Sequence, residues 1–164
     1  MSYLTIIFVC LAILSQCQAD LIGDFCAKSN NPSLCVQVLR SDPRSSGANA
    51  RGLAEIALEN AVSATQASID VAKSVSNPGN KGIIDTCIEV FGDAVDTLNE
   101  CKPLIPKQDM GSIGTLRIKG SAALTDVNTC SDEFGANEPP QLTQASARAY
   151  TFVQLLLIIA KTLQ

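Results

Sequence analysis

Two stripes of apolar residues, joined by a short proline-containing link, constrain the fold of this chain more than any other feature. Over residues 84–101, and again over residues 113–130, apolar side chains recur at alternating intervals of three and four. This rhythm places each set on one face of a helix. The link contains Pro103 and Pro106, and its shortness makes the two helices antiparallel neighbours. The stripes are Ile84, Cys87, Phe91, Ala94, Leu98 and Cys101, and then Ile113, Leu116, Gly120, Ala123, Val127 and Cys130.

Cysteines stand at matching ends of this predicted helix pair. Cys87 lies near the start of the first helix and Cys130 near the end of the second. Antiparallel packing brings both to the same end, each on its buried stripe, which is the geometry that a disulfide requires. Cys101 lies roughly 21 Å from Cys87 along the same helix and cannot replace it. Cys101 is either a buried free thiol or part of an intermolecular disulfide, and its phase with the stripe favours the free thiol.

The composition of the chain disfavours several classes of function. There is no histidine, so a Ser/His/Asp or Cys/His nucleophile cannot be built, and the commonest metal ligand is missing. The net charge of −4 and the lack of a basic patch with aromatic residues argue against a nucleic-acid partner. Residues 111–114 (GSIG) follow no strand and do not form a phosphate-binding loop. We therefore expect neither an enzyme nor a cofactor.

Residues 1–19 have the pattern of a secretory signal peptide. An apolar run over residues 4–14 precedes small residues at Cys17 and Ala19, which suit cleavage before Asp20. The run is too short for a comfortable membrane span. Residues 14–17 partly match a bacterial lipoprotein box, but Gln16 fits that motif poorly. We expect residues 1–19 to be removed and residues 20–164 to enter an oxidising compartment.

The segment over residues 20–48 predicts a helical hairpin followed by a loop. Cys26 and Cys35 have eight residues between them, Pro32 follows a turn, and Ser33 can cap a second short helix. Two short helices folded back on each other bring the two cysteines together. A zinc site is the alternative, but two cysteines without histidine make half a site. In a secreted chain a disulfide is favoured. Residues 41–47 have the composition of a loop.

Two further long helices complete the pattern. One covers residues 49–76 and is ended by Asn-Pro-Gly-Asn at residues 77–80. After a loop over residues 134–141, the other covers residues 142–163. Its apolar second half suggests a membrane anchor, but its shortness and its polar Gln154 and Lys161 favour a buried helix. The chain is therefore predicted to be all-α, with an up-down-up-down four-helix bundle over residues 49–164. The inner stripe of the first of these helices is Ala54, Leu58, Ala61, Val62, Thr65, Ile69 and Ala72.

An acidic stripe runs beside the apolar stripe of residues 84–101, with no Lys or Arg within that range. Like charges at helical spacing cost some helix stability. A solvated helix face is the simplest interpretation, and a surface that binds a basic partner is the functional one. A metal site is disfavoured, since such sites in bundles face inward and normally carry histidine, and glycoside chemistry needs a cleft. The stripe consists of Asp85, Glu89, Asp93, Asp96 and Glu100.

Several short motifs follow one another in a specific order over residues 20–164. They are Cys26 and Cys35, Ser41-Asp42-Pro43-Arg44-Ser45, Gly52-Leu53-Ala54, Cys87 with Phe91, Asp93-Ala94-Val95-Asp96 and Leu98, Ser121-Ala122-Ala123-Leu124, and Thr129-Cys130 with Phe134. In this order and spacing the chain resembles the plant invertase and pectin methylesterase inhibitors. The resemblance implies a four-helix bundle with an N-terminal helical hairpin. It also implies disulfides between Cys26 and Cys35 and between Cys87 and Cys130.

The same resemblance implies a function and a contact surface. Family members are not enzymes but block a pectin methylesterase or an acid invertase in a one-to-one complex, in the cell wall or the vacuole. In the pectin methylesterase inhibitors, acidic groups at positions matching Asp93 and Asp96 contact the enzyme. Thr129 and Asp132 match family positions beside the fourth cysteine.

The choice between pectin methylesterase and acid invertase as the target depends on residues 108 and 129. Invertase inhibitors carry a Pro-Lys-Phe motif, of which Pro106 and Lys107 are present here, while Gln108 replaces the Phe. Gln108 and Thr129 favour pectin methylesterase slightly. Periodicity alone also allows a bundle that carries a small apolar ligand, so this second function stays open at this point.

Overall fold

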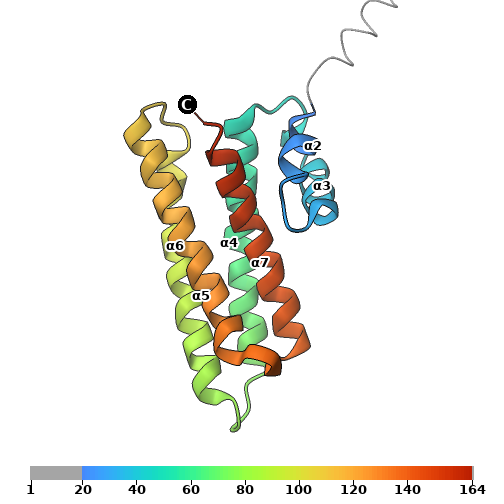
Figure 1. Cartoon of the computed structure of the whole chain (residues 1–164), viewed down its shortest axis with the longest axis vertical. Helices are drawn as coiled ribbons and strands as arrows, with labels where there is room; N and C mark the ends of the chain where they lie inside the picture. The colour runs from blue at the N-terminus through green and yellow to red at the C-terminus, as the bar shows by residue number, and fades with distance from the viewer. Residues whose placement is uncertain (1–19, 164) are drawn as a thin grey trace, which may run out of the picture.

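The computed structural model describes residues 20–163, and the expected signal peptide over residues 1–19 lies outside them. Four long helices form the body of the protein, with a short helical hairpin at its side (Figure 1). The elements in chain order are α2 (Leu21–Cys26), α3 (Pro32–Ser41), the 3-10 helix η1 (Pro43–Ser45), α4 (Ala50–Ser74), α5 (Lys81–Cys101), η2 (Lys102–Leu104), α6 (Met110–Phe134), η3 (Gly135–Asn137) and α7 (Pro140–Ala160).

The four long helices form an up-down-up-down bundle, which confirms the predicted architecture. Each helix packs chiefly against two others: α4 against α5 and α7, and α6 against α5 and α7. Figure 1 shows α5 beside α6 and α4 beside α7, with the short links at alternating ends. Short links between sequential helices permit only this antiparallel neighbour arrangement.

Local side-chain hydrogen bonds fix where two of the long helices, α4 and α6, begin. The Asn49 side-chain oxygen accepts from the Gly52 N–H at 3.0 Å, and Asp109 accepts from the Ser112 N–H at 2.8 Å. Each bond satisfies one of the N–H groups that a helix leaves unpaired at its first turn. At the other end of α6, Gly135 has a φ of 55°, which glycine adopts without strain.

The core includes the stripes that the sequence predicts for α5 and α6, every member of which is buried. On α4 the buried surface is wider than predicted and includes Leu53, Ile56 and Ala57. Val62 differs from the prediction, because it is only half-buried and lines a surface groove between α4 and α5. The reason is that α4 packs against both α5 and α7, so its inner surface is centred away from Val62.

The link before α4 contains more structure than its composition predicts. Ser41 is the last residue of α3, and η1 occupies the middle of the expected loop. The Arg44 guanidinium contacts Asp42 at 2.7 Å and Glu59 of α4 at 2.6 Å. These pairs lower the pKa of both carboxyl groups, with the side-chain hydrogen bond from Arg44 as the main cause. The motif over residues 41–45 therefore fastens the hairpin to the bundle. The other expected loop, 134–141, likewise contains η3 and the start of α7.

Helix α7 packs in the bundle, as predicted. It is long and apolar enough to cross a membrane, and it is the one described helix with this property. Most of its apolar residues nevertheless face the protein core, because they pack between α4 and α6. The buried members include Phe152, Val153, Leu155, Leu156 and Ile159, none of which has measurable exposure.

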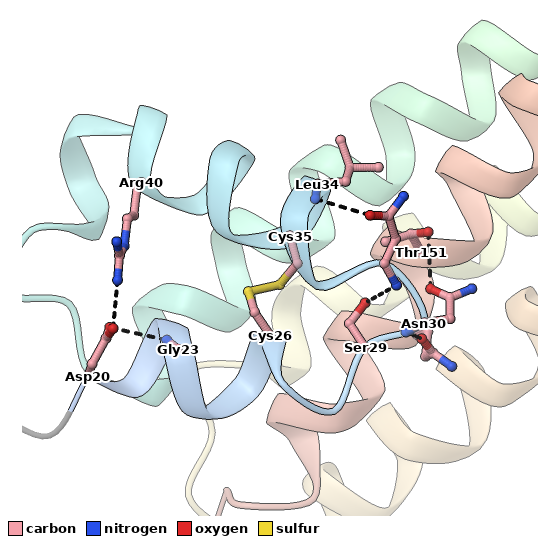
Figure 2. The surroundings of a disulfide bond; sticks show 11 residues. Asp20, Gly23, Cys26, Ser29, Asn30, Leu34, Cys35, Arg40 and Thr151 are labelled. Atoms are coloured by element: carbon pink, nitrogen blue, oxygen red, sulfur yellow. Dashed lines mark hydrogen bonds and ion pairs between the residues drawn. A yellow bond between two sulfur atoms is a disulfide. The ribbon is translucent and has the colours of Figure 1, made fainter.

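The helical hairpin docks on α7 through its turn, as Figure 2 shows. The Asn30 N–H donates to the Gln154 side-chain oxygen at 2.8 Å, and the Thr151 hydroxyl donates to the Asn30 side-chain oxygen at 3.2 Å. The predicted disulfide between Cys26 and Cys35 joins the two short helices, with their Cα atoms 5.5 Å apart. The turn is thus held from within by the disulfide and from outside by α7.

Gly120 allows α6 and α7 to approach closely. A Cβ atom at this position would lie 2.9 Å from Leu157 Cδ2. We expect Gly120→Val to lower the free energy of unfolding by about 2 kcal/mol, because a branched side chain overpacks the contact. For a chain of this size the melting temperature should fall by about 4–8 °C.

Thermal unfolding followed by circular dichroism measures this effect, with Gly120→Ala as the control. Alanine meets only the movable end of Leu157 and gains about 1 kcal/mol in helix propensity. It should therefore melt close to the wild type. Equal losses for valine and alanine would contradict the assignment of this contact.

Candidate functional site

A disulfide joins the two helices that carry the acidic residues. Cys87, near the start of α5, is bonded to Cys130, near the end of α6, with their Cα atoms 4.7 Å apart. Both cysteines are fully buried. The bond confirms the pairing expected from the two stripes, and it fixes α5 and α6 as one rigid pair.

The acidic stripe of α5 is exposed and is neutralised only at its ends. Asp85 pairs with Lys81 at 2.7 Å, and Glu100 pairs with Lys119 of α6. The central residues Glu89, Asp93 and Asp96 are exposed. Among residues 20–163, no ion pair or side-chain hydrogen bond is found for these three carboxylates. Their charges are therefore available to a partner.

Asp126 of α6 extends this charge onto the neighbouring helix. It is half-buried, and its pKa is raised first by burial and second by the nearby charge of Asp93. We call Glu89, Asp93, Asp96 and Asp126 the acidic face. The sequence interpretation missed Asp126. A signal for it exists, because Asp126 follows Lys119 by seven residues and thus lies on the same side of α6, the side that meets α5.

Thr129 and Asp132 lie further along α6, and Thr129 is closer to the acidic face than Asp132 is. Thr129 is half-buried, and its hydroxyl donates to the Thr125 carbonyl at 3.0 Å. Asp132 is exposed and accepts from the Asn128 side chain at 2.7 Å. Six residues of helix turn Asp132 about 120° away from Asp126. Thr129 therefore borders the acidic face, whereas Asp132 lies around the side of α6.

Pro106 and Lys107 lie at the opposite end of the helix pair from the disulfide. Both are exposed in the link between η2 and α6. Arg51 of α4 holds this link, because its guanidinium donates to the carbonyls of Ile105 at 2.7 Å and Lys107 at 2.6 Å. The length of α5 separates them from Thr129, so the structure does not bring all the predicted contact residues into one cluster.

Comparison with known proteins identifies the family. The family model described as plant invertase/pectin methylesterase inhibitor matches residues 20–159. This chain belongs to that family. The kiwifruit (Actinidia deliciosa) protein named pectinesterase inhibitor is 34% identical over 90% of this chain and 82% of its own. A Platanus orientalis protein, named "Putative invertase inhibitor", is 31% identical over 76% of this chain and 77% of its own.

Solved structures support the fold of this inhibitor. A mutant pectin methylesterase inhibitor from Arabidopsis has a TM-score of 0.74 and 21% identity, over 89% of this chain and 99% of its own. At that identity the likeness concerns the fold alone. The family and its named relatives are inhibitors and not enzymes, which agrees with the conclusion from the missing histidine.

The described residues show no candidate metal site, and the one free cysteine among them is buried. Within residues 20–163 no group of three acidic, histidine or cysteine side chains is placed to hold a metal ion. Cys101 is a free thiol without measurable exposure, and its Sγ lies 3.4 Å from the Thr97 carbonyl oxygen. Burial raises its pKa to about 11, so it stays a neutral thiol at neutral pH. The structure thus supports the free, buried state of Cys101.

Asp126 should make the stability of the inhibitor depend on pH. Because its pKa in the folded protein is raised above 3.8, folding favours the protonated form and is penalised as pH rises through that pKa. Asp126→Asn removes the penalty. At pH 7 we expect a gain of less than about 1 kcal/mol, or up to about 3 °C in melting temperature.

The measurement is a melting temperature for wild type and Asp126→Asn at several pH values. The gain should shrink as pH falls through the folded-state pKa and vanish below 3.8, where the wild-type carboxyl is protonated in both states. A gain of the same size at every pH would show that charge is not its cause.

Proposed function

We propose that this protein is a secreted inhibitor of a pectin methylesterase. It binds the enzyme one to one and covers the cleft that admits the pectin chain. Family membership supports inhibition, and the acidic face supports the place of contact. The main observation behind the proposed contact is that three neighbouring carboxylates on α5 are exposed and unpaired within the described chain.

The acidic face suits a basic surface for two physical reasons. Carboxylates accept charge-assisted hydrogen bonds from Arg and Lys, which are stronger than neutral ones. Like charges held side by side also steer an oppositely charged partner toward them. The disulfide and the core stripes fix α5 and α6 before binding, so little conformational freedom is lost in the complex.

Three sets of residues form the proposed contact. Asp93 and Asp96 form its centre, and Thr129 lies at its border next to Cys130. Asp132 lies further around α6 and contacts a peripheral part of the enzyme. Pro106 and Lys107 form a second contact at the far end of α5, in a link that Arg51 holds in place.

Pectin methylesterase is preferred over acid invertase as the target. Gln108 occupies the position of the aromatic residue in the invertase inhibitors' Pro-Lys-Phe motif, and it is exposed here. Acid invertase is the second candidate, because Pro106 and Lys107 are also exposed and one relative is named for invertase. Family membership favours either target over the small-ligand carrier that periodicity alone allowed.

The cell wall is the proposed place of action. The match to the plant invertase/pectin methylesterase inhibitors favours a cell-wall enzyme as the target, and the apolar segment over residues 4–14 supports export. Acid invertase as the target would extend this place to the vacuole. The two disulfides suit an oxidising compartment.

Titration of a purified plant pectin methylesterase with the inhibitor tests the stoichiometry and the mode of inhibition. With enzyme well above the dissociation constant, activity should fall linearly and end at one inhibitor per enzyme. At lower enzyme concentration, added pectin should relieve the inhibition, because substrate and inhibitor compete for one cleft. An end point other than one, or inhibition that pectin does not relieve, would contradict the proposed mode.

A further inference from the structure

A groove between α6 and α7 differs in character from the acidic face. Its volume is about 880 Å³, its apolar floor includes half-buried Leu124, Leu157 and Ile158, and Ile118 also lines it. Ile118 is 74% exposed, one of two large apolar side chains with high exposure among residues 20–163. An exposed apolar strip of this kind is typical of a contact surface.

Three cations surround this apolar floor: Lys28, Arg117 and Lys161. All three are exposed. No ion pair is found for any of them within the described chain. We call the groove with these cations the basic groove. In a chain with a net charge of −4, three cations around one groove form a local surface of opposite sign.

The basic groove and the acidic face lie on different sides of α6. Arg117 and Lys119 are two residues apart, which turns them by about 200° around the helix, and the same holds for Leu124 and Asp126. Lys119 meets α5 through Glu100, whereas Arg117 lines the groove against α7. One molecule can therefore present both surfaces at once to different neighbours.

The cations are spread along the groove, which decides the kind of occupant. Arg117 stands on α6, Lys161 near the end of α7, and Lys28 beside the turn that docks at Gln154. The α6 part of the lining spans residues 114–124, or about 15 Å. A ligand with one charged head satisfies one end only. A helix with acidic residues along one side and apolar residues beside them satisfies the whole length.

We propose that the basic groove binds the acidic face of a second copy of this protein. The central acids of α5, Glu89 to Asp96, span about 10 Å, so they are opposite in charge to the groove and fit within its length. Half-buried Ile88 and Val95 lie next to them on α5 and supply the apolar part of the contact. The two surfaces differ, so copies join head to tail.

This contact regulates inhibition. A copy whose acidic face lies in a neighbour's groove cannot present that face to an enzyme. This consequence rests on the proposed function, whereas the self-association does not. At low concentration the copies separate and the acidic face is free.

Sedimentation velocity of the secreted protein tests the contact, from about 1 μM to about 1 mM, the range of weak interfaces. The sedimentation coefficient should rise with concentration, and the rise should diminish in about 1 M NaCl, which screens charges beyond about 3 Å. Arg117→Glu/Lys161→Glu should abolish it. Lys73→Glu, at an exposed lysine on α4, is the control and should associate like the wild type.

A mixing experiment identifies which surfaces meet. Glu89→Lys/Asp96→Lys reverses the acidic face and should also be monomeric alone. Mixed with Arg117→Glu/Lys161→Glu, it should associate although neither variant does so alone, because an intact groove then meets an intact acidic face and the two reversed surfaces are also opposite in charge. Absence of association up to about 1 mM, association unaffected by the groove reversal, or an unresponsive mixture would overturn the proposal.

An inhibition assay at nanomolar concentration separates this proposal from the proposed function. There the protein is monomeric, and Arg117→Glu/Lys161→Glu should inhibit as well as the wild type does. Loss of inhibition in that variant would contradict the claim that the basic groove and the acidic face are separate binding surfaces. Failure of the wild type to inhibit would count against the proposed function alone.

Discussion

Replacing Asp93 and Asp96 together by asparagine should weaken inhibition of pectin methylesterase about 100-fold. Both carboxylates are exposed on α5, and neither has an ion pair within residues 20–163. A hydrogen bond to a charged group contributes about 1.5 kcal/mol or more, so two of them account for about 3 kcal/mol. That free energy corresponds to a factor of about 100 in the dissociation constant.

Inhibition constants measured at low ionic strength provide the test, and melting temperatures show that the bundle is intact. Asparagine keeps the shape of the side chain and removes like charge from one helix face, so stability should not fall. The matched control is Asp24→Asn/Asp70→Asn, which removes two exposed carboxylates from α2 and α4. Unchanged inhibition by the Asp93/Asp96 variant, or equal loss in the control, would rule out the proposed centre of contact.

Removing the disulfide between α5 and α6 should have the largest effect on stability. Cys87 and Cys130 are 43 residues apart in sequence, and the chain-entropy relation assigns such a loop about 4 kcal/mol. Cys26 and Cys35 are nine apart, which gives about 2.5 kcal/mol. Replacing each pair by alanine should therefore lower the melting temperature by about 8–16 °C and about 5–10 °C, respectively.

Calorimetry of the two double-alanine variants compares these losses without introducing new free thiols. The order of the two effects is the sharper test, since both absolute values depend on the entropy relation. A larger loss for the hairpin pair would show that the short disulfide carries more of the fold than its loop length implies. Inhibition should survive in the hairpin variant, because the acidic face is built on α5 and α6.

The bundle was predictable because its signals are local and periodic. The stripes of α5 and α6 recur at helical spacing, and Pro103 and Pro106 mark the link. The Cys87–Cys130 pair followed from that geometry and the Cys26–Cys35 pair from the predicted short hairpin, and both are present. What periodicity did not reveal is the orientation of α4, whose two large neighbours place Val62 beside a groove instead of in the core.

The candidate site was predictable only along one helix. Asp93 and Asp96 belong to a stripe that is visible in the sequence, whereas Asp126 joins them from α6 through packing. Ion pairs between helices could not be predicted from the stripe either, because Lys119 of α6 neutralises Glu100 of α5. Asp132, which the family motif places in the contact, lies about 120° around α6 from Asp126, because a separation of six residues does not complete a whole number of turns.

The most direct test of the account is a parallel titration of two enzymes with the wild-type inhibitor over residues 20–164. A plant pectin methylesterase and a plant acid invertase are assayed side by side, and the folded state and both disulfides are verified beforehand. The account predicts that pectin methylesterase loses activity at one inhibitor per enzyme, while acid invertase keeps its activity. Loss of invertase activity alone would contradict the target, and full activity of both enzymes would contradict the proposed function itself.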